Sequence, residues 1–552
     1  MNRFSHLMIA TLGACGLIAA SAAAAPDKAP VVDAPAGAVK GLREGDANVF
    51  RAIPYAVPPL GERRWRPPAP MPRWNGVRTA QTQGVACIQP PMAAGPYDRG
   101  KVAMSEDCLT LDVTAPAKAR KAPVMVWIHG GTLIWGSGHG EMYSGREFVK
   151  RGVVLVSINY RLGMLGYLAH PELSKESPDN VSGNYGLLDQ IAALQWVRDN
   201  IAAFGGDPHN VTIFGESAGA LSVEYLLASP RARGLFQRGI VESGYLFTTP
   251  ELRSKRGEEP AAEALGEWLA GKLGAPNLAA LRAMDARHLA EASMATGYVS
   301  YGTVDGKILT RQLVDTFEKG EQAPVPVIAG FNSGEIRTLR HLLPPVPASP
   351  AAYVEEIKTR YRDLADDYLK LYPASADLAQ NGLDSTRDAV FGWPSERLVR
   401  KQAAIGQPSY LYYFSHSYPS SDAAGLNGFH ASEVPFVFGT IGNTPPAWPA
   451  IPDTAAEHRI SAAMLDYWTS FARNGKPVSP GNAAWRPHGV EGAVMRFADV
   501  PRGETGFMPG MYALHEQVMC RRRAEGSQSW TWRTGASAPV LPAPAAGCAA
   551  EH

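Results

Sequence analysis

Residues 211–227 read VTIFGESAGALSVEYLL, in which a G-x-S-x-G motif joins two apolar segments. The run 211–214 is rich in β-branched residues and predicts a buried strand, whereas 221–227 predicts a helix. Small residues on both sides of Ser217 permit a strained turn between the two, which would expose the serine hydroxyl. The motif therefore makes Ser217 a candidate nucleophile, with a buried serine in a glycine-rich turn as the alternative.

Apolar runs of the same kind recur along the chain. Five of them are continuously apolar, at 124–128, 153–158, 240–241, 325–329 and 410–414. Strands with this pattern are typical of parallel sheets that are covered on both faces. Residues 187–201 carry apolar side chains at helical spacing, and Gly205 follows as a stop signal. The alternation of strands and helices predicts an α/β fold with a central, mostly parallel sheet flanked by helices.

The chain has 552 residues, which is more than one hydrophobic core usually serves. We therefore expect either two domains or one domain with long insertions. Helix-rich stretches near 245–320 and 340–405 are too long for simple crossovers, and we expect helical insertions there that cap the sheet. Lys and Arg number 53 and Asp and Glu 52, which gives a net charge of +1. This balance gives no electrostatic reason to expect a nucleic-acid partner or a polybasic membrane surface.

The first residues have the pattern of an export signal. Arg3 precedes an apolar run at 7–20, and small residues at 21–25 offer a cleavage site, so we expect residues 1–25 to be removed. No later apolar run reaches the ~18 residues of a membrane span. We therefore expect an exported protein, periplasmic or secreted. The alternative is a lipoprotein anchored through Cys15, although the residues after Cys15 remain apolar.

Four further cysteines could form disulfides in an exported protein. Proximity in the sequence pairs Cys87 with Cys108 and Cys520 with Cys548, although four cysteines allow three connectivities. None of them has the C-x-x-C spacing of a zinc site. We therefore expect disulfides and neither a metal nor an organic cofactor.

A glycine-rich segment, His129-Gly130-Gly131-Thr132, follows one of the expected strands. A serine nucleophile needs N–H donors aimed at the oxyanion that develops on the substrate carbonyl. In a hydrolase fold such a loop, together with the N–H of the residue after the nucleophile, here Ala218, could supply those donors. An ordinary Gly-Gly turn is the alternative.

Several motifs in this chain, in the same order, resemble those of the type-B carboxylesterase/lipase family, which includes cholinesterases and bacterial esterases. Besides the G-x-S-x-G motif and the His-Gly-Gly stretch, they are Glu106-Asp107-Cys108-Leu109, Asn159-Tyr160-Arg161-Leu162-Gly163 and Asn184-Tyr185-Gly186-Leu187-Leu188-Asp189-Gln190. The resemblance extends from residue 50 to residue 475. It implies a single α/β-hydrolase domain over 26–552 that contains the two insertions.

The resemblance also implies a Ser-Glu-His triad. Matched position by position, the family's functional residues fall on Ser217 (nucleophile), Glu335 (acid) and His430 (base), on Gly131, Thr132 and Ala218 (oxyanion hole), and on Cys87 and Cys108 (disulfide). Thr132 departs from the family pattern, which usually has Gly or Ala there. Because a β-branched residue restricts the local backbone, we expect Thr132 to narrow the space beside the substrate carbonyl.

Two histidines follow the last expected core strand, and topology alone would accept either as the base. His416 lies at the end of that strand, and its alternative role is that of a packed loop histidine. His430 lies in Gly428-Phe429-His430, which resembles the family's base motif, and is therefore the expected base. With an ordinary imidazole pKa, kcat/KM would fall below about pH 6–7, because only neutral imidazole accepts the proton.

Together these observations predict an exported serine hydrolase that cleaves carboxylic esters of small molecules through an acyl-enzyme. The same machinery acting on amides or thioesters is one alternative. A non-catalytic binding module on this fold is another, although such modules typically lose a triad residue and all three are present here. The sequence leaves the substrate and the oligomeric state open.

Overall fold

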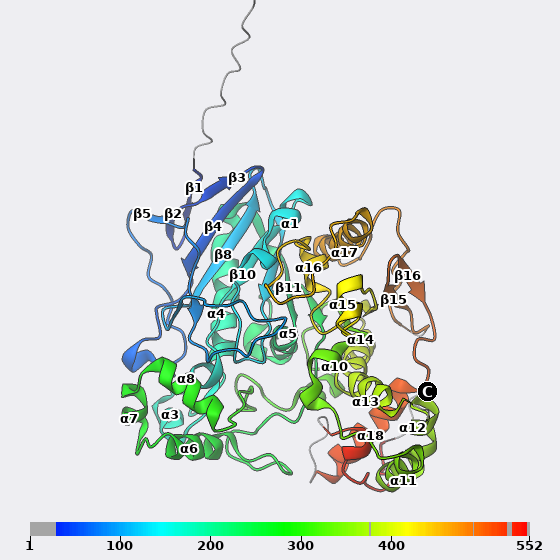
Figure 1. Cartoon of the computed structure of the whole chain (residues 1–552). Coiled ribbons are helices and arrows are strands. Elements are labelled where there is room, and N and C mark those ends of the chain that lie inside the picture. Colours follow the sequence, from blue (N-terminus) through cyan, green and yellow to red (C-terminus); the bar gives the residue numbers. More distant parts are fainter. Residues whose placement is uncertain (1–28, 375–376, 490, 527–532, 549–552) are drawn as a thin grey trace, which may run out of the picture.

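The computed structural model describes residues 29–374, 377–489, 491–526 and 533–548. The expected signal segment and Cys15 lie outside the described residues. An 11-stranded mixed sheet forms the centre of the described part, with strand order β16-β15-β14-β13-β12-β11-β9-β10-β8-β4-β3. Figure 1 shows the sheet running through the molecule with helices on both sides.

The middle of the sheet is parallel. Its strands are β9 (Ala122–Ile128), β10 (Val154–Ile158), β11 (Gly206–Glu216), β12 (Arg238–Glu242), β13 (Val327–Asn332), β14 (Ser409–Phe414) and β15 (Val494–Phe497). The prediction of a mostly parallel sheet from six apolar runs is confirmed.

Antiparallel strands form the two edges of this sheet. They are β3 (Leu42–Glu44), β4 (Ala47–Pro54) and β8 (Thr110–Pro116) at one edge and β16 (Pro501–Glu504) at the other. A small sheet, β1 (Val31–Ala34), β2 (Gly37–Lys40) and β5 (Val77–Thr79), and the pair β6 (Ala86–Cys87) and β7 (Met104–Ser105) lie outside the main sheet.

Both faces of the sheet are covered, which explains the continuous apolar runs. Along β9, Val124 and Val126 belong to one hydrophobic cluster, whereas Met125 and Trp127 belong to another on the opposite face. The first cluster includes apolar residues of α4 (Tyr185–Asn200) and α5 (Ala218–Ala228). The second includes residues of α16 (Val434–Phe438) and α17 (Ala455–Asn474).

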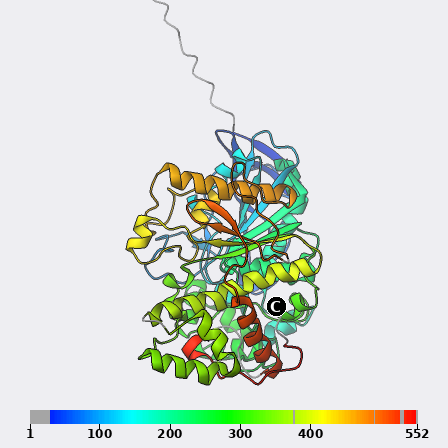
Figure 2. The same cartoon turned by 90° about the vertical axis from the view of Figure 1, so that its right-hand side faces the viewer.

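The two long stretches expected as insertions are helical. The first contains α6 (Ala262–Lys272), α7 (Leu278–Ala283), α8 (Ala286–Ala295) and α9 (Leu313–Glu318). The second contains α11 (Pro350–Tyr361), α12 (Ala365–Leu371), α13 (Leu378–Arg387), a π-helical segment (Asp388–Gly392) and α14 (Trp393–Ala404). In Figures 1 and 2 α11 and α12 lie beside α18 (Met511–Glu525), away from the sheet. Helix α14, in contrast, packs on β13 and β14, because two parallel neighbouring strands need a crossover between them.

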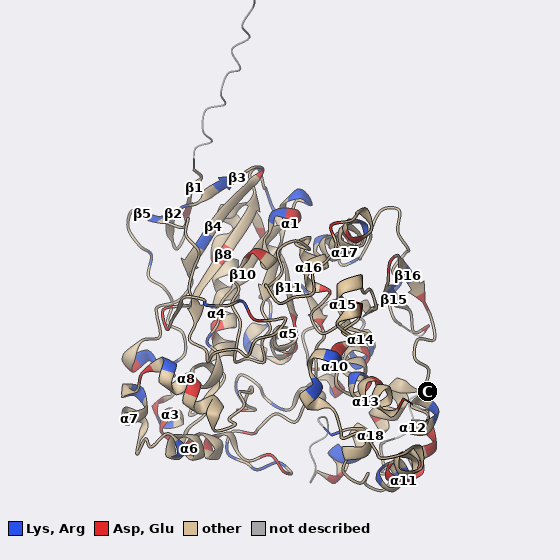
Figure 3. Cartoon of the chain, in the orientation of Figure 1, with Lys and Arg blue, Asp and Glu red and all other residues tan. Residues whose placement is uncertain are grey.

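Charge and covalent links agree with the sequence analysis. In Figure 3 basic and acidic residues are interspersed over the helices. Disulfides join Cys87 to Cys108 and Cys520 to Cys548, with Cα–Cα distances of 5.0 and 5.6 Å. Within the described ranges, no helix is both long and apolar enough to cross a membrane.

Candidate active site

Ser217 lies on a strained turn between β11 and α5. Its backbone angles, φ 56° and ψ −121°, fall in a region that residues other than glycine rarely adopt. The Ser217 N–H donates a hydrogen bond of 2.9 Å to the carbonyl of Glu242, which holds the turn against β12. A Cβ atom at Gly219 would lie 2.0 Å from the carbonyl oxygen of Ile128, so only glycine fits there. The local sequence thus produces the strand–turn–helix geometry that the motif predicts.

Glu335 and His430 are brought together from two different loops. Glu335 begins a short helix, α10 (Glu335–Thr338), just after β13. His430 lies further along the chain, after β14, in the connection between α15 (Pro419–Ala423) and α16. Oε2 of Glu335 lies 2.5 Å from Nδ1 of His430. Its other oxygen, Oε1, accepts hydrogen bonds from the Ser243 hydroxyl at 2.6 Å and from the Asn332 N–H at 2.8 Å. These donors fix the fully buried carboxylate in one orientation toward the imidazole.

The second imidazole nitrogen faces the end of β11. Nε2 of His430 lies 3.1 Å from Oε1 of Glu216, the residue before Ser217. Within the described residues no hydrogen bond joins His430 to the Ser217 hydroxyl itself. Hydrogen bonds of this kind are often long in free enzymes and shorten only when substrate is bound. The structure therefore brings the imidazole to the serine turn, with a carboxylate on each side of the ring.

The two carboxylates change the acid–base properties of His430. Burial alone would lower the pKa of His430, but the charges of Glu216 and Glu335 and the hydrogen bond to Glu335 outweigh it and raise that pKa to about 9. The expectation of an ordinary imidazole pKa is therefore wrong, because the sequence did not indicate that Glu216 adds a second carboxylate to Glu335 beside the ring. Burial in turn raises the pKa of the Glu216 carboxyl, His430 opposes this rise, and Glu335 adds to it.

Two further buried carboxyls lie near this pair and were missed by the sequence analysis. Burial raises the pKa of Glu242 to about 8, although a hydrogen bond of 2.7 Å from the Trp468 indole N–H opposes the rise. Burial and the charges of Glu216 and Glu242 raise the pKa of Glu433, which accepts a hydrogen bond from the Asn332 side chain. The one local signal in the sequence for this group of buried carboxyls was the position of Glu216 inside the G-x-S-x-G motif.

The His-Gly-Gly segment approaches the serine turn. A Cβ atom at Gly130 would lie 3.2 Å from Cβ of Ser217, so the loop backbone runs beside the serine. Gly131, Thr132 and Leu133 all have positive φ, at 106°, 58° and 58°. Among the described residues, the N–H groups of Gly131 and Thr132 have no acceptor, nor has the N–H of Ala218 at the start of α5. These N–H groups, one directly after Ser217 and two in the loop that runs beside it, thus lack a partner in the described part of the chain and are free to bind an anionic oxygen.

His416 lies in a different setting from His430. Its Nε2 is 2.7 Å from Glu457 and its Nδ1 is 3.3 Å from Asp499. Both of its nitrogens are thus engaged with carboxylates that are not part of the serine turn. Of the two histidines that the sequence left open, His430 is the one that contacts Glu335 and Glu216.

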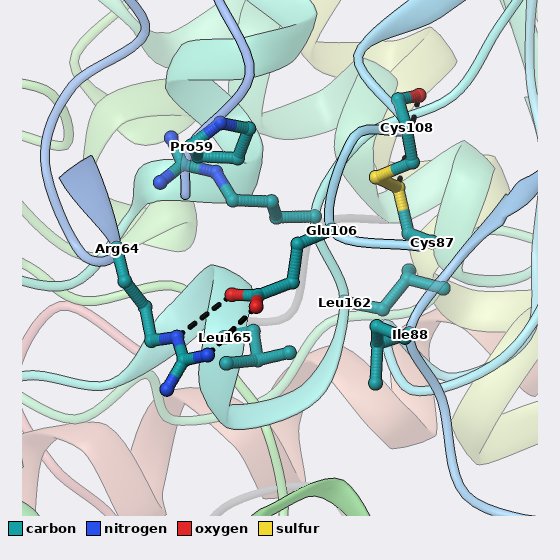
Figure 4. A pocket seen from close by; sticks show the side chains of 9 residues that line it. Pro59, Arg64, Cys87, Ile88, Glu106, Cys108, Leu162 and Leu165 are labelled. Atoms are coloured by element: carbon teal, nitrogen blue, oxygen red, sulfur yellow. Dashed lines mark hydrogen bonds and ion pairs between the residues drawn. A yellow bond between two sulfur atoms is a disulfide. The ribbon is translucent and has the colours of Figure 1, made fainter. Parts of the chain in front are cut away.

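A small cavity of about 10 Å³ lies beside the disulfide Cys87–Cys108. Figure 4 shows the side chains that line it. The cavity is bordered by the ion pair between Arg64 and Glu106, whose closest atoms are 2.7 Å apart. A volume of this size holds at most a single water molecule. Within the described part of the chain, no group of three or more His, Cys, Asp or Glu residues is placed to hold a metal ion.

Comparison with known proteins shows the family of the chain. The model of the carboxylesterase family matches residues 28–506. Fumonisin B1 esterase of Sphingopyxis macrogoltabida is 36% identical over 487 residues, which cover 85% of this chain and 86% of that protein. A medium-chain fatty acyl-CoA hydrolase precursor of Anas platyrhynchos is 32% identical over 538 residues, which cover 88% of this chain and 91% of that protein.

Solved structures show the same likeness. A PNB esterase superimposes with a TM-score of 0.76 at 30% identity, covering 88% of this chain and 99% of its own. A carboxylesterase of Geobacillus stearothermophilus gives a TM-score of 0.75 at 32% identity, with the same coverage. The chain has the α/β-hydrolase fold. From its sequence, its fold and these relatives, it belongs to the carboxylesterase family and is a carboxylic ester hydrolase.

Proposed function

We propose that Ser217, His430 and Glu335 form a nucleophile–base–acid triad that hydrolyses esters through an acyl-enzyme. The observation that carries the proposal is the contact of one imidazole, His430, with Glu335 on one nitrogen and with the end of the serine turn on the other. A serine hydroxyl at its ordinary pKa is a poor nucleophile, so it needs such a base.

In the acylation step, the Ser217 oxygen attacks the ester carbonyl carbon while Nε2 of His430 takes the hydroxyl proton. Glu335 holds the imidazole by its Nδ1–H and stabilises the imidazolium that forms. The tetrahedral intermediate then expels the alcohol, which receives the proton from His430. In the second step water attacks the acyl-enzyme, again with His430 as base, and the acid is released.

The negative charge of the tetrahedral intermediate requires donors that are already in place. The N–H groups of Gly131, Thr132 and Ala218 support this role, because all three lack another acceptor among the described residues. Ala218 directly follows Ser217, and Gly131 and Thr132 follow Gly130, whose backbone runs beside Ser217. Removing one such donor typically lowers kcat by about 10²–10³-fold. Thr132 is exposed. We expect its β-branched side chain to narrow the space beside the substrate carbonyl.

The same triad could also cleave thioesters, and one relative favours this second activity. The Anas platyrhynchos protein is named a fatty acyl-CoA hydrolase, which acts on a thioester. Because both ester classes pass through the same acyl-enzyme, they differ only in the leaving group. Matched acyl esters, thioesters and amides with one acyl chain would separate the three activities by their kcat/KM values.

Substitution of the proposed nucleophile tests the reaction. We expect Ser217→Ala to lose at least about 10⁴-fold in kcat, because members of a triad act as a unit. Ser222→Ala is a matched control, since Ser222 also lies on the buried part of α5 and bonds to the carbonyl of Ala218. The control should retain kcat within about threefold. A folded Ser217→Ala protein with a tenth of the parent activity would overturn the proposal.

The expected export of the protein is a separate proposal. Two disulfides support it, because they persist mainly in oxidising compartments. Amino-terminal sequencing of the protein from the native host checks the expectation: a start near residue 26 would support signal cleavage, and a lipidated Cys15 would support the anchored alternative. A start at Met1 would contradict both.

A further inference from the structure

The side chain of Gln89 connects the disulfide loop to the segment that follows His129-Gly130-Gly131-Thr132. Its carbonyl oxygen Oε1 accepts the N–H of Gly136 at 2.9 Å, and its Nε2 donates to the carbonyl of the same Gly136 at 2.9 Å. Nε2 also donates to the carbonyl of Cys87 at 3.0 Å. One amide group thus pairs with both polar groups of one backbone residue, a two-point contact that fixes position and orientation.

A chain of contacts leads from Gly136 to the oxyanion-binding N–H groups. The neighbouring Trp135 donates its backbone N–H to the carbonyl of Gly131 at 2.8 Å, and Ile134 donates to the same carbonyl at 3.0 Å. The peptide unit that carries the Gly131 carbonyl also carries the N–H of Thr132, and in a planar trans peptide the two groups point in opposite directions. Fixing the Gly131 carbonyl therefore also fixes the direction of the Thr132 N–H.

The loop that carries Gln89 is itself anchored to the rest of the protein. Gln89 lies two residues after Cys87, which is bonded to Cys108. The Arg64–Glu106 ion pair and this disulfide line the same small cavity, as Figure 4 shows. The next residue, Pro90, accepts a hydrogen bond of 3.1 Å from the Trp135 indole N–H. The strained, glycine-rich oxyanion segment is thus held from outside by a covalently closed loop.

We infer that Gln89 is a positioning residue for the oxyanion-binding N–H groups. This inference rests on the proposed function. It assigns to Gln89 no contact with the substrate: Gln89 acts through Gly136, Trp135 and the Gly131–Thr132 peptide. Without the Gln89 amide, the segment that follows His129 loses the contact that holds it in one conformation. The enzyme then stabilises the transition state less well, whereas it binds the uncharged substrate almost as before.

Two substitutions test this role in the full-length enzyme. Gln89→Met keeps the length of the side chain and removes its hydrogen bonds, and Gln89→Glu keeps an acceptor for the Gly136 N–H but cannot donate to the Gly136 carbonyl when ionised. Gln81→Met is the matched control. Gln81 is likewise half-buried and donates to one backbone carbonyl, that of Gly41, but it lies by the antiparallel edge of the sheet.

The readout compares two inhibitors with catalysis. A trifluoromethyl ketone forms a tetrahedral adduct with the nucleophile and places an oxyanion in the hole, whereas a non-hydrolysable ether analogue of the substrate stays uncharged. For Gln89→Met we expect kcat/KM to fall about 10–100-fold and the Ki of the ketone to rise by the same factor. The Ki of the ether should remain within about twofold, and Gln89→Glu should show the same pattern at about tenfold.

A merely structural role would weaken both inhibitors alike or lower only the melting temperature. Either folded Gln89 variant with parent-like kcat/KM and ketone affinity would overturn the inference. So would a variant in which both inhibitors lose affinity equally. These results would leave the proposed function untouched, because that function is tested separately by the activity of Ser217→Ala.

Discussion

The charge of Glu216 should set the pH range in which the enzyme works. Its Oε1 lies 3.1 Å from Nε2 of His430, and both side chains are buried. A negative charge there stabilises the imidazolium form and so raises the pKa of His430. Because only neutral imidazole can accept the serine proton, kcat/KM should rise with pH through this raised pKa. In the parent enzyme the acid limb is therefore expected above the ordinary imidazole value, toward about 9.

Replacing Glu216 by Gln removes this charge and keeps the shape. Two unit charges about 4 Å apart interact by about 1 kcal/mol in a water-like dielectric and about 4 kcal/mol at the effective dielectric of a protein site. One pKa unit corresponds to about 1.4 kcal/mol, so removal of the charge would lower the pKa of His430 by about 0.7–3. We therefore expect the pKa of His430 to fall by about 1–2 units.

The assay is the pH profile of kcat/KM on a neutral ester, corrected for spontaneous hydrolysis. For Glu216→Gln the acid limb should move to lower pH by about 1–2 units. Glu224→Gln is a matched control, because burial keeps the pKa of Glu224 high and its side chain makes no hydrogen bond among the described residues. The acid limb of the Glu224→Gln variant should stay at the pH of the parent enzyme. An acid limb that does not move in Glu216→Gln, or that moves to higher pH, would refute the reasoning.

Three further predictions concern other parts of the site and fold. His430→Ala should lower kcat by several orders of magnitude, whereas His416→Ala should preserve it within about tenfold; the reverse pattern in two folded proteins would exchange their roles. Gly131→Ala should lower kcat at least 100-fold, because its Cβ would lie 2.2 Å from a backbone oxygen, and parent-like activity would contradict the loop's role. Replacing Cys87 and Cys108 by Ser should lower the free energy of unfolding by roughly 3 kcal/mol in urea titrations, whereas an unchanged midpoint would argue against a stabilising cross-link.

Much of the fold was predictable because its central strands are covered on both faces. Continuous apolar runs marked β9 to β14, with bounds that differ by a few residues. The edge strands were not found, since a strand such as β4 mixes Asn48 and Arg51 with apolar residues. Helix α14 was assigned to an insertion, because its role as a crossover depends on which strands become neighbours.

The site was predictable in part. The motif around Ser217 is local and fixes its own turn, so sequence alone singled it out. Glu335 and His430 were found only through the family resemblance, since sheet topology, which no local pattern encodes, brings them together. Glu216 and Gln89 were missed as contributors, because their roles depend on burial and on contacts between loops that lie apart in the sequence.

The acyl-enzyme itself gives the most direct test of the proposed chemistry. The enzyme is mixed rapidly with an ester that acylates quickly and deacylates slowly, quenched in acid, and measured by intact-protein and peptide mass spectrometry. We expect one added acyl group per chain, located on Ser217, with the alcohol released in a burst of the same size. An adduct on another residue, or the same burst from Ser217→Ala, would contradict the proposed mechanism.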